Sequence, residues 1–537
     1  MSGDAAAAGL DAAAPQAGFR SATNVQVSRD QDPAAGLRSG ASETTVAAAL
    51  DSFRAVAGWN DGEGFQFAPF TPGTPALGLS GFGFTHDGGR TWTDGGAPPM
   101  GNTVAFGPGT QGRSATGNYV TRGDPWLDVD SGLLNPTFYY ANLAVWEDDA
   151  AAPPAGISIH RGQFDRRGNF AWGDSVLVQS PNYPNDFLDK EALAVDRRGG
   201  HTALYVSVTN FEEVCNIPTG GFGTIEMYRS LDGGMTWART IIQPDETIVT
   251  DPADPACGQD GVVNQGSMPV VAPNGDVYVT WERGFQAPDA GGSVLARPTI
   301  AFARSGDQGA TFTAPSQVAS ICGINDNEPA AYNRTNSNDF PRIAVAKSGL
   351  HRGRIYISYH DCSPAAGSAA SDADTDVFVT FSDDRGATWS TPTPVHAIAD
   401  GKQQFWPVVS VDLLGRVDVT YYQMQDINVT PDPNDIECSV RTGGPLNDPI
   451  LKQSTVTTFS DVFRVRSNNG GRTWGAPQRV TDVTTNWCRA TPINSIIPNF
   501  GDYNTSVSRL FSVFAVWADG RNAGIVDRVP TVFFSRL

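Results

Sequence analysis

The chain has 537 residues, of which 40% are hydrophobic, and its formal net charge is −20. A negative field of this size repels phosphate backbones and anionic lipid headgroups, so we expect neither nucleic acid nor a membrane as a partner. No run of residues approaches the ~18 apolar positions that a membrane-spanning helix needs. Gly and Pro are frequent, with 58 and 37 residues, and long stretches of helical period are missing. The sequence therefore predicts an all-β protein, which at this length can be one large domain.

The N-terminal segment, residues 1–22, is rich in alanine and lacks the basic and apolar regions of a signal peptide. We interpret it as a disordered leader, or as the start of a mature chain from which a signal has been removed. Residues 23–537 are expected to form a single domain.

An eight-residue pattern recurs along this domain. It reads THDGGRTW from Thr85, SLDGGMTW from Ser230, SGDQGATF from Ser305, SDDRGATW from Ser382 and SNNGGRTW from Ser467. Later copies follow one another at a spacing of roughly 80 residues, and a period of this size indicates a stacked or radial array. The first gap is about twice as long, so one repeat has lost the pattern; a weak remnant is HRGQFDRRGNFAW, from His160 to Trp172.

Each repeat predicts four antiparallel strands. Two short apolar strands come first, as in MPVVAP and VYVTWER, a third strand leads into the pattern and a fourth leaves it. Four antiparallel strands per repeat are typical of a β-propeller blade. With the repeat that lacks the pattern, we expect seven blades, and six are the alternative if that region is an insertion.

The last repeat contains only three strands before the chain stops, at the point where another copy of the pattern should open. We expect the missing strand to come from NVQVS, residues 24–28. An N-terminal strand in this place would close the ring and hide its open edges.

The repeated pattern resembles the Asp box, or BNR repeat, of sialidases and related β-propeller proteins. Four copies match in full, and the fifth has an asparagine at the Asp position. A short acid in a turn can accept hydrogen bonds from the N–H groups of that turn, and a following glycine can adopt a positive φ. We therefore expect the box residues to be structural; they are Asp87, Asp232, Asp307, Asp384 and Asn469.

The candidate site is expected on the opposite face, where loops enter the first strand of each blade and leave the second. Acids, arginines and aromatic rings in these loops suit a carbohydrate site. Each residue alone is better explained as a solvated rim residue, because strand ends are commonly polar. LDKEALAVD is the strongest motif, since Asp189, Lys190 and Glu191 follow one another at the expected pore, although Lys190 could simply neutralise its neighbours.

The resemblance to sialidases implies three arginines that clamp a sugar carboxylate, a tyrosine nucleophile paired with a glutamate, and an aspartate as acid/base. The clamp would be Arg283, Arg342 and Arg521; the nucleophile Tyr503 or Tyr422, its partner Glu282 or Glu191, and the acid/base Asp124 or Asp61. Further substrate-binding candidates are Asp189, Lys190, Trp406, His360 and Tyr422. The Arg-Ile-Pro motif of sialidases is matched only in part, by PRIAV at Arg342, and seven blades differ from their usual six.

Three functions remain open. The first is a secreted, sialidase-like glycoside hydrolase that acts on a glycan or polysaccharide. The second is another carbohydrate-active propeller, either a glycosidase with two carboxylates or a polysaccharide lyase in which His360 and Tyr422 act on a uronate. The third is a non-catalytic propeller that binds glycan or protein. None requires a cofactor, although an acidic rim could hold structural calcium. The oligomeric state is left open.

Six cysteines show no zinc-binding spacing. Their even number suits three disulfides in a secreted, periplasmic or cell-surface protein, with free buried thiols as the alternative. Pairing of nearest neighbours would join Cys215 to Cys257, Cys322 to Cys362, and Cys438 to Cys488.

Overall fold

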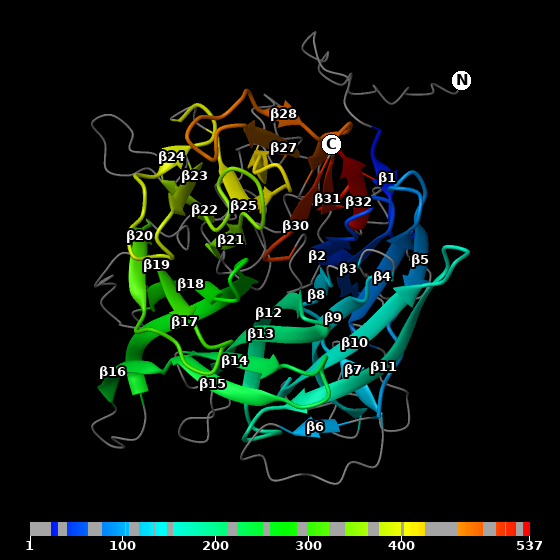
Figure 1. The fold of residues 1–537 in the computed structure, drawn as a ribbon, viewed down its shortest axis with the longest axis vertical. Coiled ribbons are helices and arrows are strands. Elements are labelled where there is room, and N and C mark those ends of the chain that lie inside the picture. Colours follow the sequence, from blue (N-terminus) through cyan, green and yellow to red (C-terminus); the bar gives the residue numbers. More distant parts are fainter. Residues whose placement is uncertain are drawn as a thin grey trace, which may run out of the picture.

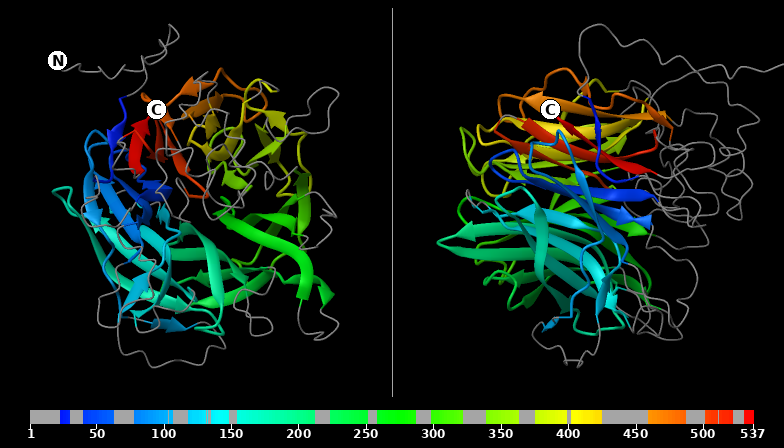
Figure 2. Two further views of the ribbon diagram at one scale, coloured as in Figure 1. Left: turned by 180° about the vertical axis from the view of Figure 1, so that it is seen from behind. Right: turned by 90° about the vertical axis from the view of Figure 1, so that its right-hand side faces the viewer.

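The computed structural model describes residues 23–29, 40–62, 78–102, 104–106, 118–130, 132, 135–147, 154–211, 223–250, 258–286, 298–321, 339–362, 375–398, 402–424, 459–486, 501–510, 512–521 and 530–537. These residues form β-strands and no α-helix, so none of them belongs to a helix long and apolar enough to cross a membrane. They make seven sheets around a central axis (Figures 1 and 2). The prediction of a seven-bladed, all-β propeller is confirmed, and the six-bladed alternative is wrong. The predicted leader, 1–22, lies outside the described residues.

The first three blades follow one another along the chain. Blade 1 contains β2 (Ala41–Ala48), β3 (Ala55–Asp61), β4 (Ser80–Thr85) and β5 (Thr93–Gly96). In blade 2 both β7 (Tyr119–Thr121) and β8 (Trp126–Val129) pair with β9 (Phe138–Trp146), which is followed by β10 (Gly156–Phe164), β11 (Phe170–Gln179) and the parallel edge strand β6 (Val104–Phe106). Blade 3 contains β12 (Phe187–Arg198), β13 (His201–Phe211), β14 (Thr224–Ser230) and β15 (Ala238–Gln243).

The next three blades repeat this order. Blade 4 contains β17 (Gly258–Val271), β18 (Val277–Gln286), β19 (Thr299–Ser305) and β20 (Ser316–Ser320), with β16 (Glu246–Thr250) added beside β17. Blade 5 contains β21 (Arg342–Val345), β22 (Ile355–Cys362), β23 (Thr375–Ser382) and β24 (Thr393–Pro394). Blade 6 contains β25 (Gln404–Val411), β26 (Val417–Met424), β27 (Phe459–Ser467), β28 (Gln478–Arg479) and β29 (Thr485–Asn486).

Blade 7 joins the two ends of the described chain. It contains β30 (Thr505–Arg509), β31 (Ser512–Asp519), β32 (Thr531–Arg536) and, as its fourth strand, β1 (Val25–Gln26). Val25 lies opposite Phe534 and Gln26 opposite Phe533, and β1 runs beside β32 in Figure 1. The prediction that an N-terminal strand closes the ring is confirmed.

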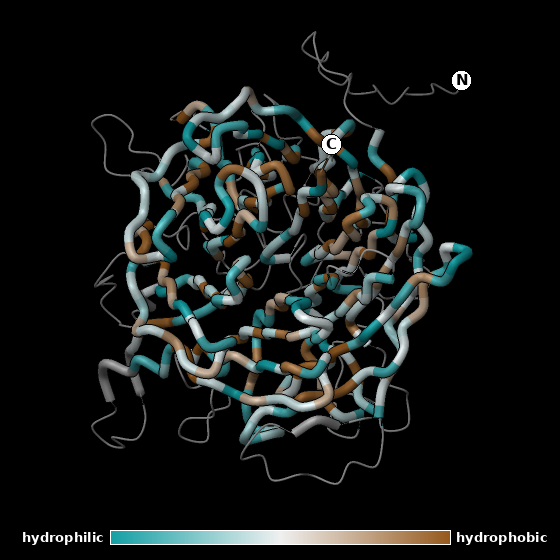
Figure 3. The backbone as a smooth tube through the Cα atoms, viewed as in Figure 1, coloured by the Kyte–Doolittle hydropathy of each residue, from teal (hydrophilic) through white to brown (hydrophobic). Residues whose placement is uncertain are grey.

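Hydrophobic side chains fill the spaces between neighbouring blades. Each of seven clusters of buried residues joins two adjacent blades, the last one joining blade 7 to blade 1 through Phe514, Val46 and Trp59. Each blade packs against a neighbouring blade on both faces, so its inner strands are buried on both sides. Their sequences are therefore nearly continuous apolar runs, as in β9, where all nine residues are buried. Hydrophobic segments accordingly lie inside the ring, and hydrophilic ones follow much of its circumference (Figure 3).

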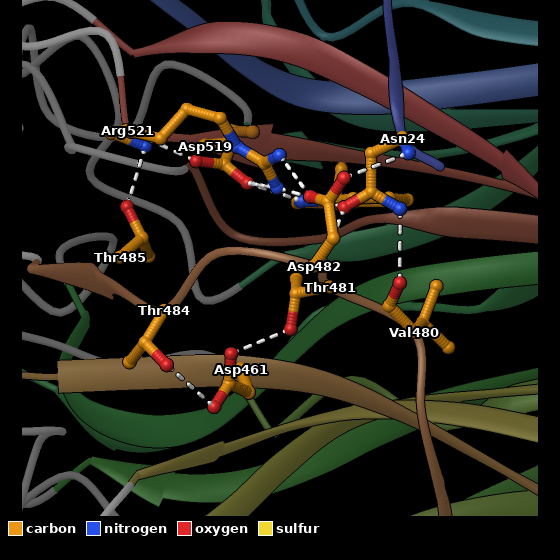
Figure 4. A network of polar contacts seen from close by, with 12 residues as sticks. Asn24, Asp461, Val480, Thr481, Asp482, Thr484, Thr485, Asp519 and Arg521 are labelled. Carbon is orange, nitrogen blue, oxygen red and sulfur yellow. Dashed lines mark hydrogen bonds and ion pairs between the residues drawn. The ribbon is translucent and has the colours of Figure 1, made fainter. Parts of the chain in front are cut away.

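A polar network holds the closing strand in place (Figure 4). The Asn24 side chain donates to the Val480 carbonyl oxygen (2.9 Å) and accepts from the Asp482 N–H (2.8 Å) and from Arg521 (2.9 Å). Arg521 also pairs with Asp482 and with Asp519 (2.7 Å), and its guanidinium stacks on Phe533 at 4.1 Å. These contacts connect β1 to blades 6 and 7.

Asn24→Ala is expected to destabilise the protein by about 1–3 kcal/mol, because it leaves the buried Val480 carbonyl and the Asp482 N–H without this partner. Denaturant unfolding followed by tryptophan fluorescence measures the effect. An unchanged midpoint would mean that β1 is held by its backbone pairing alone.

The five repeated turns share one hydrogen-bond arrangement. In the turn at Ser230, the Asp232 carboxylate accepts from the Ser230 hydroxyl (2.7 Å), the Thr236 N–H (2.9 Å) and the Thr236 hydroxyl (2.6 Å). Gly234 has φ +97°, and the Trp237 indole donates to its carbonyl oxygen at 3.0 Å. All five turns lie between the third and fourth strands of their blades. The side-chain oxygen at the Asp position therefore accepts hydrogen bonds from within its own turn in all five copies.

The repeat without the pattern is blade 2, and its remnant occupies the equivalent turn between β10 and β11. Asp165 accepts from the N–H groups of Arg167 (2.8 Å) and Asn169 (2.9 Å). The Asn169 side-chain amide donates to the same carboxylate at 2.9 Å, in the role that the threonine hydroxyl has elsewhere. The carboxylate has therefore been retained while the flanking residues have changed.

The fifth turn has an asparagine at the Asp position, so it indicates how the other turns should respond to an Asp→Asn substitution. Asn469 accepts from the Thr473 N–H (3.0 Å), and its Nδ2 donates to the Thr473 hydroxyl (2.7 Å), which reverses the hydrogen bond made to an aspartate. Asp232→Asn should therefore cost less than about 1 kcal/mol, whereas Asp232→Ala, which removes the acceptor of several bonds, should cost about 1–3 kcal/mol. Equal losses of unfolding free energy for the two variants would contradict this role of the side-chain oxygen.

Candidate active site

The first strands of the seven blades line an axial cavity of about 320 Å³. At one end of this cavity, residues with positive φ occupy the starts of the first strands. Four of them are not glycines: Glu43 (φ 51°), Asp124 (54°), Lys190 (53°) and Trp406 (48°). Such conformations cost of order 1–3 kcal/mol each and are typical of functional positions. At Glu43, Lys190 and Trp406 the conformation accompanies a register shift between the first and second strands.

Three of these residues belong to one buried group of side chains, here called the axial cluster. Its members are Glu43, Asp124, Lys190, Glu191, Arg342, Asp502 and Tyr503, contributed by blades 1, 2, 3, 5 and 7. At its centre the Lys190 ammonium lies 2.7 Å from Asp502 Oδ2, 2.8 Å from Asp124 Oδ2 and 3.0 Å from Glu43 Oε1. One cation therefore faces three carboxylates.

Glu191 differs from these three carboxylates. It is 1% exposed, and neither of its carboxyl oxygens has a hydrogen-bond partner among the described residues. Burial raises the pKa of Glu191 well above its ordinary value, and the nearby negative charge of Asp124 raises it further. The raised pKa favours the protonated form of Glu191, whereas Glu43, Asp124 and Asp502 contact the Lys190 ammonium.

Arg342 and Tyr503 cover another side of the cluster. The Arg342 guanidinium lies 5.4 Å from the ring centres of both Tyr503 and Trp126, within range of a cation–π interaction. Burial lowers the pKa of Arg342 to about 10, so it remains charged at neutral pH. The Tyr503 hydroxyl donates to the Pro125 carbonyl oxygen at 3.1 Å, and burial raises the pKa of Tyr503 well above its ordinary value.

Two amides fix the carboxylates from outside the cluster. The Asn60 side chain donates to Glu43 Oε2 (2.8 Å) and accepts from the Asp124 N–H (2.7 Å). Gln265, from blade 4, donates to Asp189, whose side chain is 16% exposed and lies 4.0 Å from Lys190. Asp189 and Asp124 are more exposed than the other acids around Lys190, so a ligand would meet the cluster there.

A second polar group lies at the same end of blades 4 and 5. His360 Nε2 and Asp339 Oδ1 are 2.5 Å apart, and both side chains are 1% exposed. Burial, and then the charge of Asp339, raise the pKa of Glu282 well above its ordinary value. Glu282 lies opposite Gln265 in the strand pair β17–β18, which connects this group to the axial cluster.

The other predicted residues have different surroundings. Arg283 pairs with Glu246 of β16 (2.6 Å), a strand that lies at the periphery of the ring in Figure 1. Arg521 belongs to the network that holds β1 (Figure 4). Of the three predicted clamp arginines, only Arg342 therefore lies in the axial cluster. Trp406 and Tyr422 pack edge to face at 5.8 Å in the core between blades 6 and 7.

Cys362 is buried at the end of β22 and is disulfide-bonded. The other five cysteines lie outside the described residues, so the predicted pairing stays a prediction. Within the described ranges, no three or more His, Cys, Asp or Glu side chains are arranged to hold a metal ion.

The partners of Lys190 carry no local sequence signal. Glu43 lies at the start of the first strand β2, and Asp502 lies just before the first strand β30. No motif distinguishes them from other acids at such positions. Residues that enter first strands converge because those strands line the axis. Arg283 lies near the end of the second strand β18, and Arg521 follows the second strand β31. Second strands are one strand farther from the axis than first strands, which explains why these two arginines are held elsewhere.

No protein-family model and no curated protein match the chain. Among solved structures, it is similar to the GH93 α-L-arabinofuranosidase of Fusarium graminearum in complex with arabinobiose (12% identity over 75% of this chain and 92% of that one, TM-score 0.39). It is also similar to the Trypanosoma rangeli sialidase in complex with sialic acid (12% identity, 82% and 58%, TM-score 0.37). A third similar structure is the Penicillium chrysogenum α-L-arabinanase complexed with arabinobiose (12% identity, 64% and 93%, TM-score 0.29). Likenesses this low do not bear on which reaction the chain carries out.

Proposed function

We propose that the protein is a glycoside hydrolase whose reaction takes place at the axial cluster, with Glu191 as the general acid. The observation that carries the proposal is that two neighbouring carboxyl groups, those of Glu191 and Asp124, have different surroundings. Glu191 is buried without a hydrogen-bond partner among the described residues and has a raised pKa, whereas Asp124 contacts Lys190 at 2.8 Å. Glycoside hydrolysis requires two carboxyl groups in different surroundings, one that holds a proton and one that acts as a carboxylate.

In this proposal the residues have separate tasks. Glu191 donates its proton to the leaving oxygen of the glycosidic bond, and Asp124, which contacts the Lys190 ammonium, acts on the opposite side of the sugar as base or nucleophile. Asn60 holds Asp124 through its backbone N–H.

The charge of the cluster favours a neutral sugar. Four acids surround Lys190, with Glu191 next to them, and Arg342 is the single arginine that the described residues place in this group. A substrate carboxylate would meet an excess of negative charge and would lack a complete clamp.

A sialidase-like reaction is the second candidate. It is favoured by the contact between Arg342 and Tyr503 and by the carboxyl groups of Glu43 and Glu191 near Tyr503. In that case Tyr503 would be the nucleophile and Arg342 one arm of the carboxylate clamp. The proposal needs the Tyr503 hydroxyl to leave the Pro125 carbonyl oxygen when a substrate binds.

The test is the release of 4-methylumbelliferone from a panel of neutral pyranosides and furanosides, with a sialoside in parallel, by the purified full chain. Turnover of a neutral glycoside supports the proposal, and turnover of the sialoside alone would replace it with the sialidase-like reaction. No turnover of either, with a glycan retained on an array, would show a binding propeller instead.

We also propose that the protein works in an oxidising compartment, outside the cytosol. The disulfide at Cys362 and the even number of cysteines support this. Thiol counting on protein isolated from its native source, before and after reduction, tests it.

A further inference from the structure

A second cavity, of about 260 Å³, lies away from the axis, where the segment that follows β5 meets blade 2. Its described lining residues are Gly78, Ala97, Pro98, Pro99, Met100, Tyr119, Thr121 and His160. The volume far exceeds the roughly 15 Å³ that one water molecule needs. Met100 is 46% exposed, so the lining of the cavity reaches the protein surface at this residue, here called its lip.

His160 is the unusual residue of this cavity. It is 0% exposed, and within the described part of the chain neither ring nitrogen has a hydrogen-bond partner. The Thr121 hydroxyl beside it has none either. Buried polar atoms in native proteins are nearly always paired, so two unpaired nitrogens on one wall of a cavity indicate a missing partner.

The surroundings of His160 restrict what this partner can be. Burial lowers the pKa of His160 to about 3, so the imidazole is neutral and offers one N–H donor and one acceptor. The rings of Trp172, Tyr119 and Tyr140 lie 6.0, 6.2 and 6.4 Å from the imidazole. None of the described lining residues is charged, and alanine, proline and methionine at residues 97–100 make up half of them. An ionic ligand would be poorly stabilised here.

We propose that this cavity binds a small, neutral, flat organic molecule that carries one hydroxyl or amide group, with His160 recognising that group. The apolar wall formed by residues 97–100 would receive the body of the ligand. Several polar groups converging in an otherwise apolar cavity is the usual composition of a small-molecule site. The site is separate from the axial cluster and does not depend on the reaction proposed there.

The experiment uses phenol and toluene as probes of equal shape, of which only phenol has a hydroxyl. The chain has six histidines, so protein labelled at histidine Cε1 gives six resolvable NMR signals. Phenol should shift the His160 signal saturably, and toluene should bind at least about tenfold more weakly, as the loss of a buried hydrogen bond predicts. His160→Phe identifies the signal and should abolish phenol binding, while His201→Phe, which alters an exposed histidine, should not change it.

Because His160→Phe could disturb the core of blade 2, Met100→Trp provides a second variant. This exposed position can fill the cavity from its lip and should weaken phenol binding at least about tenfold with the His160 signal still present. A His160 signal that saturating phenol leaves unchanged would overturn the proposal and show that water alone fills the cavity. Equal affinities for phenol and toluene would overturn it as well, because the His160 imidazole would then make no contribution through the phenol hydroxyl.

Discussion

Glu191→Gln is expected to lower kcat for a 4-methylumbelliferyl glycoside by about 10²–10⁴-fold, the usual contribution of a general acid. Glutamine preserves the shape of the buried side chain but has no proton to give to the leaving oxygen. The raised pKa of Glu191 also predicts that kcat of the unsubstituted protein falls as alkaline pH removes this proton. The alkaline limb of the pH profile should disappear in the variant.

Two comparisons separate lost chemistry from lost structure. A dinitrophenyl glycoside, whose leaving group needs no protonation, should be cleaved by Glu191→Gln at close to the original rate. Glu246→Gln removes a carboxylate that pairs with Arg283 at the periphery and should leave both rates unchanged. If Glu191→Gln slowed both substrates equally, Glu191 would not be the acid.

Lys190→Met should lower the free energy of unfolding by about 3–5 kcal/mol at pH 7, the effect of removing one partner from a buried ion pair. Glu43, Asp124 and Asp502 would then be buried near one another without their shared cation. Denaturant titration measures the loss. Arg283→Met is the matched control; its side chain is 38% exposed, so loss of its ion pair should cost no more than about 1 kcal/mol.

The pH dependence of the unfolding free energy of the Lys190→Met variant tests whether unpaired buried carboxylates cause the loss of stability. Without the ammonium, the pKa values of the three buried carboxyl groups rise above their unfolded values, so the folded state binds more protons than the unfolded state. The stability of the variant should therefore fall as pH rises above about 4 and recover as pH is lowered toward 4. A deficit that is independent of pH would mean that packing, not charge, is lost.

The fold was predictable because the repeated turn needs particular residues at fixed offsets. Ser230, Asp232, Gly234 and Thr236 each make a hydrogen bond within a few residues, so the local sequence contains the whole arrangement. Even blade 2, which has lost most of the pattern, keeps Asp165 in the equivalent role. The closing strand was predictable from the strand that the last repeat lacks.

The site was predictable only in part. Lys190 and Glu191 stand out in one motif, but Glu43 is 147 residues from Lys190 along the chain and Asp124 is 66 residues away. The positive φ at Glu43 and Lys190 has no sequence signal, since neither residue favours this conformation. His160 lies within an ordinary buried strand, and its missing hydrogen bonds become visible only when its neighbours are placed.

Closure of the ring by β1 also determines when, during synthesis, the fold can be completed. Asn24 leaves the ribosome 497 residues before Arg521, which binds it. Blades can fold in turn as domains of a growing chain do, but the edge of β32 has no partner until β1 returns to it. During that interval the same edge can accept β1 of a neighbouring nascent chain, because an unpaired strand edge binds any matching strand. Translation at high polysome density should therefore favour strand-exchanged dimers over closed monomers.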